Sequence, residues 1–177
     1  MNTKNAFKAH FFTLIFIFIA SISKSQTASF KLISSAFEEG KPIPAKYTCD
    51  SSNVSPALSW SGFPEKTKSF AIIMDDPDAP MGTWVHWVMY NIPGTVTSLE
   101  EELNIEKIKA TDGLNSWGDK GYNGPCPPGG THSYVFKLYA LDNTLTLKEG
   151  MEKDELLQAM KGHILSEATL TGLFRVE

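Results

Sequence analysis

The sequence predicts a mainly β domain with one principal helix near its carboxyl end. Short runs rich in β-branched and aromatic residues recur along the chain, and turns that carry glycine or proline separate them. Several of these runs alternate with the period of two that is typical of a strand. Residues 151–163 form the one segment with convincing helical spacing of apolar residues.

The first 25 residues are typical of a secretory signal peptide. Lysines precede an apolar run at 11–20, and small residues stand ahead of a cleavage point near Ser25. The apolar run is shorter than the about 20 residues that a membrane-spanning helix needs. We therefore expect export, either to a periplasm or to the medium, and a domain at 26–177 without a transmembrane span. An uncleaved anchor is the alternative.

The predicted mature chain is acidic. Removing residues 1–25 takes away three lysines and no acidic residue, so the formal charge changes from −4 to 13 − 20 = −7. Nucleic-acid binding rests on Lys and Arg side chains that neutralise phosphates, so no nucleic-acid partner is predicted. The remaining 177 − 25 = 152 residues suffice for one domain with a substantial core.

Cys49 and Cys126 are the two cysteines of the chain. In the oxidising compartment that an exported chain meets, an even number of cysteines favours a disulfide. Two separate buried thiols fit the sequence as well, because sequence separation does not determine the distance between Cα atoms. Since both cysteines are placed on loops, we predict that they lie close enough to pair. The prolines that flank Cys126 supply no base, which disfavours a catalytic thiol.

Five segments in the first half of the chain are predicted as strands. Prolines indicate that the second segment, 41–48, lies at a sheet edge. The fourth segment, 69–74, is continuously apolar, which is typical of a strand buried on both faces. The fifth alternates with a period of two, which predicts His86 on the same face as Val88 and opposite Trp87. In order, these segments are 30–33, 41–48, 57–60, 69–74 and 84–90.

The second half is predicted to contain a helical turn, two strands and the principal helix. The first of these strands places His132 and Tyr134 on one face, next to a stiff loop rich in glycine and proline at 121–130. The principal helix has one apolar face and ends near His163. The segments are a helical turn at 98–105, a strand at 131–141, the helix at 151–163 and a closing strand at 168–176.

Three carboxylates, those of Asp75, Asp76 and Asp78, follow the buried strand at 69–74. An acidic turn would explain them, since Asp and Pro are favoured in turns. The alternative is that one carboxylate turns inward, where burial requires a partner. His86 and His132 both lie on apolar strands beside loops with proline or glycine. Each could be a core histidine bonded to a carbonyl, but the coincidence favours a shared site.

Three motifs occur in order along the chain, namely Asp76-Pro-Asp-Ala-Pro80, Trp84-x-His86 and Gly124-Pro-Cys-Pro-Pro-Gly-Gly-Thr-His-Ser-Tyr134. With these motifs the chain from Phe30 onward resembles the phosphatidylethanolamine-binding protein family, and it looks most like the bacterial branch, often called Raf-kinase-inhibitor-like. The resemblance implies mainly antiparallel β-sheets with a small anion-binding pocket. The ligand-binding residues that it implies are Asp76, Pro80, His86, Gly124, His132 and Tyr134.

The chemistry of these residues is compatible with an anion site. Two imidazoles and a tyrosine hydroxyl can donate to a phosphate or carboxylate oxygen, and N–H groups of the glycine-bearing loop can add to them. We expect Asp76 to hold a histidine in the required tautomer and raise its pKa, or to accept an ammonium such as that of ethanolamine. The predicted function is that of an exported binding protein for a small anion such as phosphate or a phosphorylated head group.

Two other function classes fit the sequence. One is a protein-partner or protease-inhibitor module that uses the pocket rim, and the other is a weak hydrolase with a His–Asp pair as general base. No Gly-x-Ser-x-Gly motif and no evident nucleophile support the hydrolase, so no catalytic residue is predicted. Asp76, His86 and His132 suit zinc as ligand types but form no short-spaced motif, so neither a metal nor a cofactor is predicted.

Overall fold

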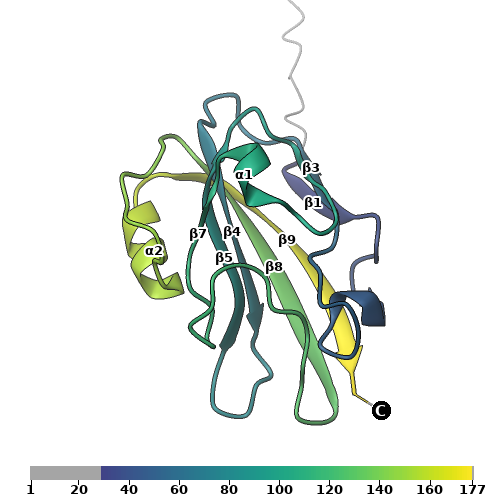
Figure 1. Ribbon diagram of the computed structural model, residues 1–177. Coiled ribbons are helices and arrows are strands. Elements are labelled where there is room, and N and C mark those ends of the chain that lie inside the picture. The colour runs from purple at the N-terminus through teal and green to yellow at the C-terminus, as the bar shows by residue number, and fades with distance from the viewer. Residues whose placement is uncertain (1–28, 177) are drawn as a thin grey trace, which may run out of the picture.

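Two β-sheets make up most of the chain that the structure describes (Figure 1). The structure is a computed structural model that describes residues 29–176, so the predicted signal peptide at 1–25 lies outside the described residues. The prediction of a mainly β fold is confirmed. Among residues 29–176, no helix is long and apolar enough to cross a membrane.

The larger sheet has six strands in the order β2-β9-β8-β4-β5-β7. Its neighbouring strands run antiparallel, except that β2 pairs with β9 in parallel. As predicted for a segment with proline, β2 lies at an edge. The strands are β2 (Lys41–Pro42), β4 (Ser69–Asp76), β5 (Trp84–Pro93), β7 (Thr111–Asp112), β8 (Thr131–Leu141) and β9 (Ile164–Arg175).

The smaller sheet has three antiparallel strands in the order β1-β3-β6, with β1 at Lys31–Ser34, β3 at Leu58–Ser61 and β6 at Ser98–Leu99. The helical turn predicted to begin at residue 98 is therefore placed too early. It forms as α1 (Ile105–Ile108), where Asn104 accepts a hydrogen bond from the N–H of Glu106 at 3.0 Å. A 3₁₀ turn, η1, spans Ala45–Tyr47.

Apolar side chains form two clusters. One fills the space between the two sheets, and the other covers the far face of the larger sheet. Trp60 of the smaller sheet packs in the first cluster with Phe70 and Phe136 of the larger one. Ile73 and Leu156 belong to the second cluster, beneath the principal helix. Each such fully buried side chain contributes about 1.5–3 kcal/mol of transfer free energy. The larger sheet is thus covered on both faces.

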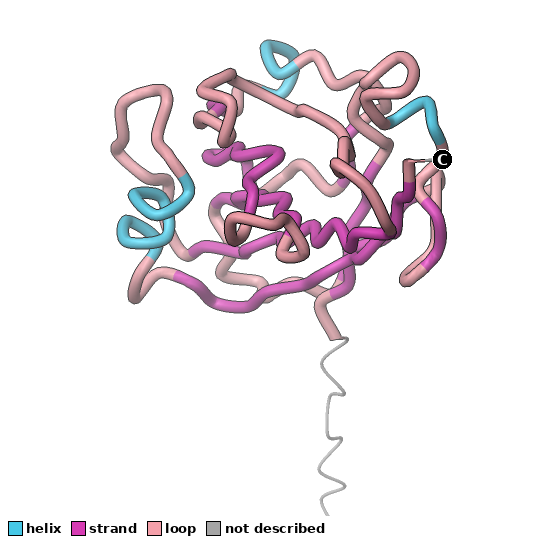
Figure 2. Tube along the Cα trace, turned by 90° about the horizontal axis from the view of Figure 1, so that it is seen from below, coloured by secondary structure: helices cyan, strands magenta, loops and turns pink. Residues whose placement is uncertain are grey.

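The principal helix, α2 (Lys153–Met160), is shorter than the predicted 151–163. Glu152 and Glu155 form a capping box at its beginning. Its end is set by Gly162, whose φ of +85° turns the chain out of the helix. The next strand, β9, therefore begins at Ile164, earlier than the predicted residue 168. Figure 2 shows α2 on one side of the strands and η1 on the other.

Candidate ligand-binding site

The pairing of β8 with β4 brings His132 and Asp76 together. As predicted, alternate residues of β8, including His132, Tyr134 and Phe136, face the same side of the sheet and are buried. Asp75 pairs with Val135, so Asp76, one residue further along β4, lies on the side of Tyr134. Nδ1 of His132 lies 2.7 Å from Oδ2 of Asp76. The inward carboxylate that burial requires to be paired is therefore Asp76, and its partner is His132.

The three carboxylates of this segment have separate partners. The other oxygen of Asp76 accepts from the N–H of Asp78 at 2.9 Å. Asp78 in turn accepts from the N–H of Ser133 at 2.8 Å, and this hydrogen bond lowers the pKa of Asp78. Asp75 lies on the opposite face, where Lys137 and Lys153 donate to it at 2.6 and 2.9 Å. The segment is both an acidic turn and the source of one inward carboxylate.

A β-bulge in β5 sets the direction of His86. Met74 pairs with Trp87 and Asp75 pairs with Val85, so His86 is the extra residue between two pairs. The bulge shifts the alternation by one position. Trp87 consequently packs in the cluster between the sheets, on the side of His86, and Val88 packs in the cluster beneath α2. The predicted grouping of His86 with Val88 and opposite Trp87 is wrong for this reason.

The hydrogen bonds of His86 determine its tautomer. Its Nδ1 lies 2.8 Å from the carbonyl oxygen of Asn123 and 3.1 Å from that of Gly124. Carbonyl oxygens only accept, so Nδ1 carries the proton. Nε2 has no hydrogen-bond partner among residues 29–176, yet it is not sealed from solvent. This nitrogen is free to contact a ligand.

Burial lowers the pKa of His86, against the opposing effects of the Asn123 carbonyl and the charge of Asp76. Asp76 acts on the pKa of His86 in the expected direction, but the effect of burial is larger, so the net shift is downward. Its ring packs edge-on against two aromatic rings, those of Tyr134 at 5.1 Å and Trp117 at 4.9 Å between ring centroids. Apolar rings on two sides explain why the charged form is disfavoured.

Gly124 supports the site through its backbone. Its N–H donates to Oδ1 of Asn53 at 2.8 Å, and its carbonyl accepts from His86. A Cβ at this position would collide with the carbonyl oxygen of Tyr47 and lie 2.7 Å from Oδ1 of Asn53. The expectation that this loop N–H donates to an anion is wrong for Gly124, because that group is already bonded. Glycine allows the loop to approach residues 47–53 closely.

A disulfide holds the same two loops together. The sulfur atoms of Cys49 and Cys126 are bonded, with 5.4 Å between the Cα atoms, so the predicted pairing is confirmed. The N–H of Cys49 also donates to the carbonyl oxygen of Pro125 at 3.1 Å. The carbonyl groups of Asn123 and Gly124, which orient His86, therefore lie next to two residues, Pro125 and Cys126, that are fixed to the facing loop.

The Tyr134 side chain is fully buried, and its hydroxyl lies near the Asp76 carboxylate and the Cys126 N–H without a hydrogen bond of good geometry among the described residues. Burial, and then the negative charge of Asp76, raises the pKa of Tyr134, so the group stays a neutral donor. An unpaired buried hydroxyl costs about 1–3 kcal/mol. A ligand or a water molecule that accepts from it would recover part of this cost.

A pocket of about 420 Å³ opens at the end of β4 and β5. Of the six predicted site residues, Asp76, Pro80 and His86 line it. The other three, Gly124, His132 and Tyr134, lie behind this lining and contact it. The lining residues are Asp76, Ala79, Pro80, Met81, Trp84, His86, Trp117, Cys126 and Pro128.

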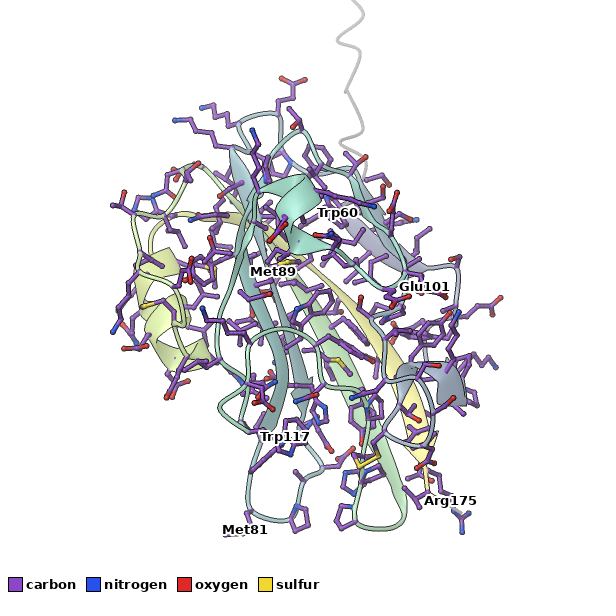
Figure 3. The ribbon with its side chains drawn as sticks, viewed as in Figure 1. Trp60, Met81, Met89, Glu101, Trp117 and Arg175 are labelled. Atoms are coloured by element: carbon purple, nitrogen blue, oxygen red, sulfur yellow. A yellow bond between two sulfur atoms is a disulfide. The ribbon has the colours of Figure 1, made fainter. Side chains whose placement is uncertain are left out.

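Sequence reasoning missed the aromatic wall of this pocket. Trp84 and Trp117 pack edge to face with ring centroids 5.3 Å apart. The position of Trp84 near His86 in the chain could have indicated that it lines the site. Trp117 could not be predicted in this way, because it lies in an irregular segment without any periodic pattern. Met81 is 97% exposed and Trp117 is 45% exposed, and both lie at the end where the β4–β5 loop turns (Figure 3). They form an apolar rim.

The surface has two larger hollows, one of which adjoins the pocket. One, of about 970 Å³, shares Met81, Trp84 and Trp117 with the pocket but contains neither histidine. The other, of about 680 Å³, lies between β1 and β9. Within residues 29–176, no three side chains of His, Cys, Asp or Glu are grouped so that they could hold a metal ion. Of these three hollows, the smaller pocket is the one that combines a concave surface with the predicted titratable groups.

Comparison with known proteins gives a consistent result. A family model described as phosphatidylethanolamine-binding protein matches residues 33–175. A UPF0098 protein of Methanothermobacter thermautotrophicus is 50% identical over 143 residues, which cover 79% of this chain and 95% of that protein. A UPF0098 protein of Chlamydia muridarum is 45% identical over 149 residues, which cover 81% of this chain and 97% of the relative.

Solved structures show the same likeness. A crystal structure from Chlamydia trachomatis, described as a phosphatidylethanolamine-binding protein homolog, superposes with a TM-score of 0.80 at 43% identity, covering 84% of this chain and 99% of the other. Escherichia coli YbcL, described as a new member of the mammalian family of these proteins, gives a TM-score of 0.77 at 32% identity, covering 85% and 100%.

Proposed function

This chain belongs to the phosphatidylethanolamine-binding protein family, and from this premise we propose that it binds a small phosphate- or carboxylate-bearing ligand in the pocket of Asp76 and His86. The observation that carries the proposal is a set of three polar groups at one end of this pocket: His86 lines it, His132 and Tyr134 lie directly behind the lining, and each imidazole can donate through Nε2 once it is protonated. His86 and His132 each have Nδ1 bonded to a protein oxygen, which leaves Nε2 available. The Tyr134 hydroxyl lacks a partner among residues 29–176.

The charge of the pocket restricts the ligand further. Asp76 is an acceptor while it is ionised and opposes an anion, unless a protonated imidazole balances it. A ligand that joins an anionic oxygen to a hydrogen-bond donor would suit both groups. Phosphoethanolamine has this character, since its phosphate can face the imidazoles and its ammonium can face the carboxylate. The rings of Trp84 and Trp117 add surfaces on which an ammonium can pack.

The lining residues favour binding over hydrolysis. They include neither serine nor threonine, and the sulfur of Cys126 is held in a disulfide. A general base therefore has no protein nucleophile to activate in the pocket wall. The exposed side chains of Met81 and Trp117 make a protein partner at the rim the second candidate.

Export is also part of the proposal. The leader-like segment at 1–25 supports it. The disulfide between Cys49 and Cys126 supports it independently, because disulfides persist in oxidising compartments such as a periplasm or the extracellular medium.

Calorimetric titration tests the binding function. Phosphate, acetate and phosphoethanolamine are titrated into the protein and into the variants His86→Ala, His132→Ala and His163→Ala. We expect His132→Ala to cost about 1.5–3 kcal/mol of phosphate binding, the range for a hydrogen bond to a charged group. His163 is the matched control, because its side chain is 44% exposed and pairs with Asp142 away from the pocket. Unchanged affinity in both His86→Ala and His132→Ala would refute the site.

A further inference from the structure

A second concave surface lies between two strand edges and shares no lining residue with the proposed ligand pocket. The hollow of about 680 Å³ has residues 30–34 on one wall and 167–170 on the other. The two walls are β1 and the first half of β9, which contact each other. In Figure 1 they are the purple strand and the yellow strand.

The edge of β9 that faces away from β8 is only partly paired. β2 pairs with it at Gly172 and Leu173. One step earlier, the carbonyl of Thr171 accepts from the N–H of Gly40, and its own N–H donates to a side-chain oxygen of Glu39, both at 2.8 Å. Glu39 thus takes the place that a neighbouring strand would have at Thr171.

The open part of this edge begins beyond Thr171. Backbone groups on one edge of a strand belong to alternate residues, so Thr169 and Glu167 are the next to face outward. Within residues 29–176, neither pairs with a strand on that side. Their N–H and C=O groups can therefore receive an additional strand.

The edge of β1 has the same property. Trp60 of β3 donates its N–H to the carbonyl of Thr97, away from β1, and it stands opposite Leu32 in the β1–β3 register. The Leu32–Trp60 pair is therefore not hydrogen-bonded across β1 and β3. The backbone groups of Leu32, and of Ser34 two residues on, point to the open edge. Among residues 29–176, the hollow therefore has backbone groups without a hydrogen-bond partner on both walls.

The charges of the hollow determine which segment fits. Glu38, Glu39 and Glu167 line it, and Lys31 is the lining residue of opposite sign. A second copy of the chain that paired antiparallel about Glu167 would bring two like charges opposite each other, which is unfavourable. An extended segment with Lys or Arg opposite Glu167 avoids this repulsion. Ile33, which is 59% exposed, offers an apolar contact to a neighbouring side chain.

We propose that this hollow binds an extended peptide segment of another protein, which adds as a strand to the open edge of β9 and places a basic side chain against Glu167. Backbone hydrogen bonds supply affinity in this type of recognition, and alternate side chains supply specificity. The site is separate from the proposed ligand pocket, so each can be lost without the other.

The test uses two capped hexapeptides, one alternating valine with lysine and the other alternating valine with glutamate. Binding to the protein is followed by amide chemical shifts. We expect saturable binding of the lysine peptide, with shifts at residues 167–170 and 31–34, and about tenfold weaker binding of the glutamate peptide. Glu167→Gln should reduce this preference. No saturable binding of the lysine peptide at millimolar concentration, or equal binding of both peptides, would overturn the proposal.

Variants at Thr169 test the backbone contact. Thr169→Pro removes the outward N–H without removing a bond to β8, which proline tolerates at an edge strand. We expect it to weaken the lysine peptide about tenfold, whereas Thr169→Val keeps the N–H and should leave binding unchanged. Unchanged phosphate titrations in the variant that loses peptide binding show that the fold is intact. Equal peptide binding by the proline and valine variants, or occupation of the edge by a second copy in a solution dimer, would contradict the assignment.

Discussion

At the scale of single residues, the site depends on which carboxylate turns in which direction. Asp75 and Asp76 are adjacent on a strand, so the period of two sends them to opposite faces. Asp75 binds two lysines on the α2 side, and Asp76 binds His132 on the pocket side. The sequence could predict that one carboxylate turns inward, because an acidic segment ends a buried strand. It could not identify the partners of Asp75 and Asp76, because these side chains are far away in the sequence.

The lowered pKa of His86 leads to a prediction for anion binding. In its neutral form, Nδ1 carries the proton and Nε2 can only accept. Donation from Nε2 to an anion thus requires protonation, which occurs below the ordinary value of 6.5. Sulfate stays ionised across this range, so its affinity should rise as the pH falls from about 7.5 to about 5.5. Calorimetry at several pH values measures this dependence.

The control for the pH experiment is His86→Gln, which cannot gain a charge. We expect a shallower pH dependence of sulfate affinity in this variant, and circular dichroism establishes that both proteins remain folded. A sulfate affinity that is independent of pH in the unmodified protein, or the same pH dependence in both proteins, would mean that His86 does not donate to the anion.

At the scale of elements, the two strands that carry the histidines differ in how far the sequence predicts them. β8 keeps a regular period, so the common face of His132 and Tyr134 follows directly from spacing. β5 has a bulge at His86, and no local residue pattern indicates it. The end of α2 was missed for a related reason, since Ile164 continues the helical spacing although Gly162 has already turned the chain.

The loop at 121–130 gives a prediction for stability. Gly124→Ala should lower the free energy of unfolding by roughly 1–3 kcal/mol, because its Cβ would force the loop away from Tyr47 and Asn53. Phosphate affinity should fall with it, since the carbonyl that orients His86 moves. Gly129→Ala is the matched control, because a Cβ there meets no atom within 4 Å. Denaturant unfolding of both variants makes the comparison, and equal stability would contradict the role given to Gly124.

At the scale of the whole molecule, the residue patterns predicted a mainly β domain with one principal helix, whereas the antiparallel sheets with a small pocket were predicted from the family resemblance. Short apolar runs indicate strands but not their partners, so the division into a six-stranded and a three-stranded sheet was not predictable from spacing. The pairing of Cys49 with Cys126, 77 positions away, was one of two open alternatives from the residues. Three strands and two loops far apart in sequence must come together before His86, His132 and Asp76 share a pocket.

The most direct test of this shared pocket is a nitrogen NMR titration of the histidine side chains with phosphate. We expect the Nε2 resonances of His86 and His132 to shift together along one saturation curve, while those of the half-exposed His163 stay in place. Saturable phosphate binding that leaves both His86 and His132 unshifted would contradict the proposed site, because the anion would then bind elsewhere and the two residues would be core histidines.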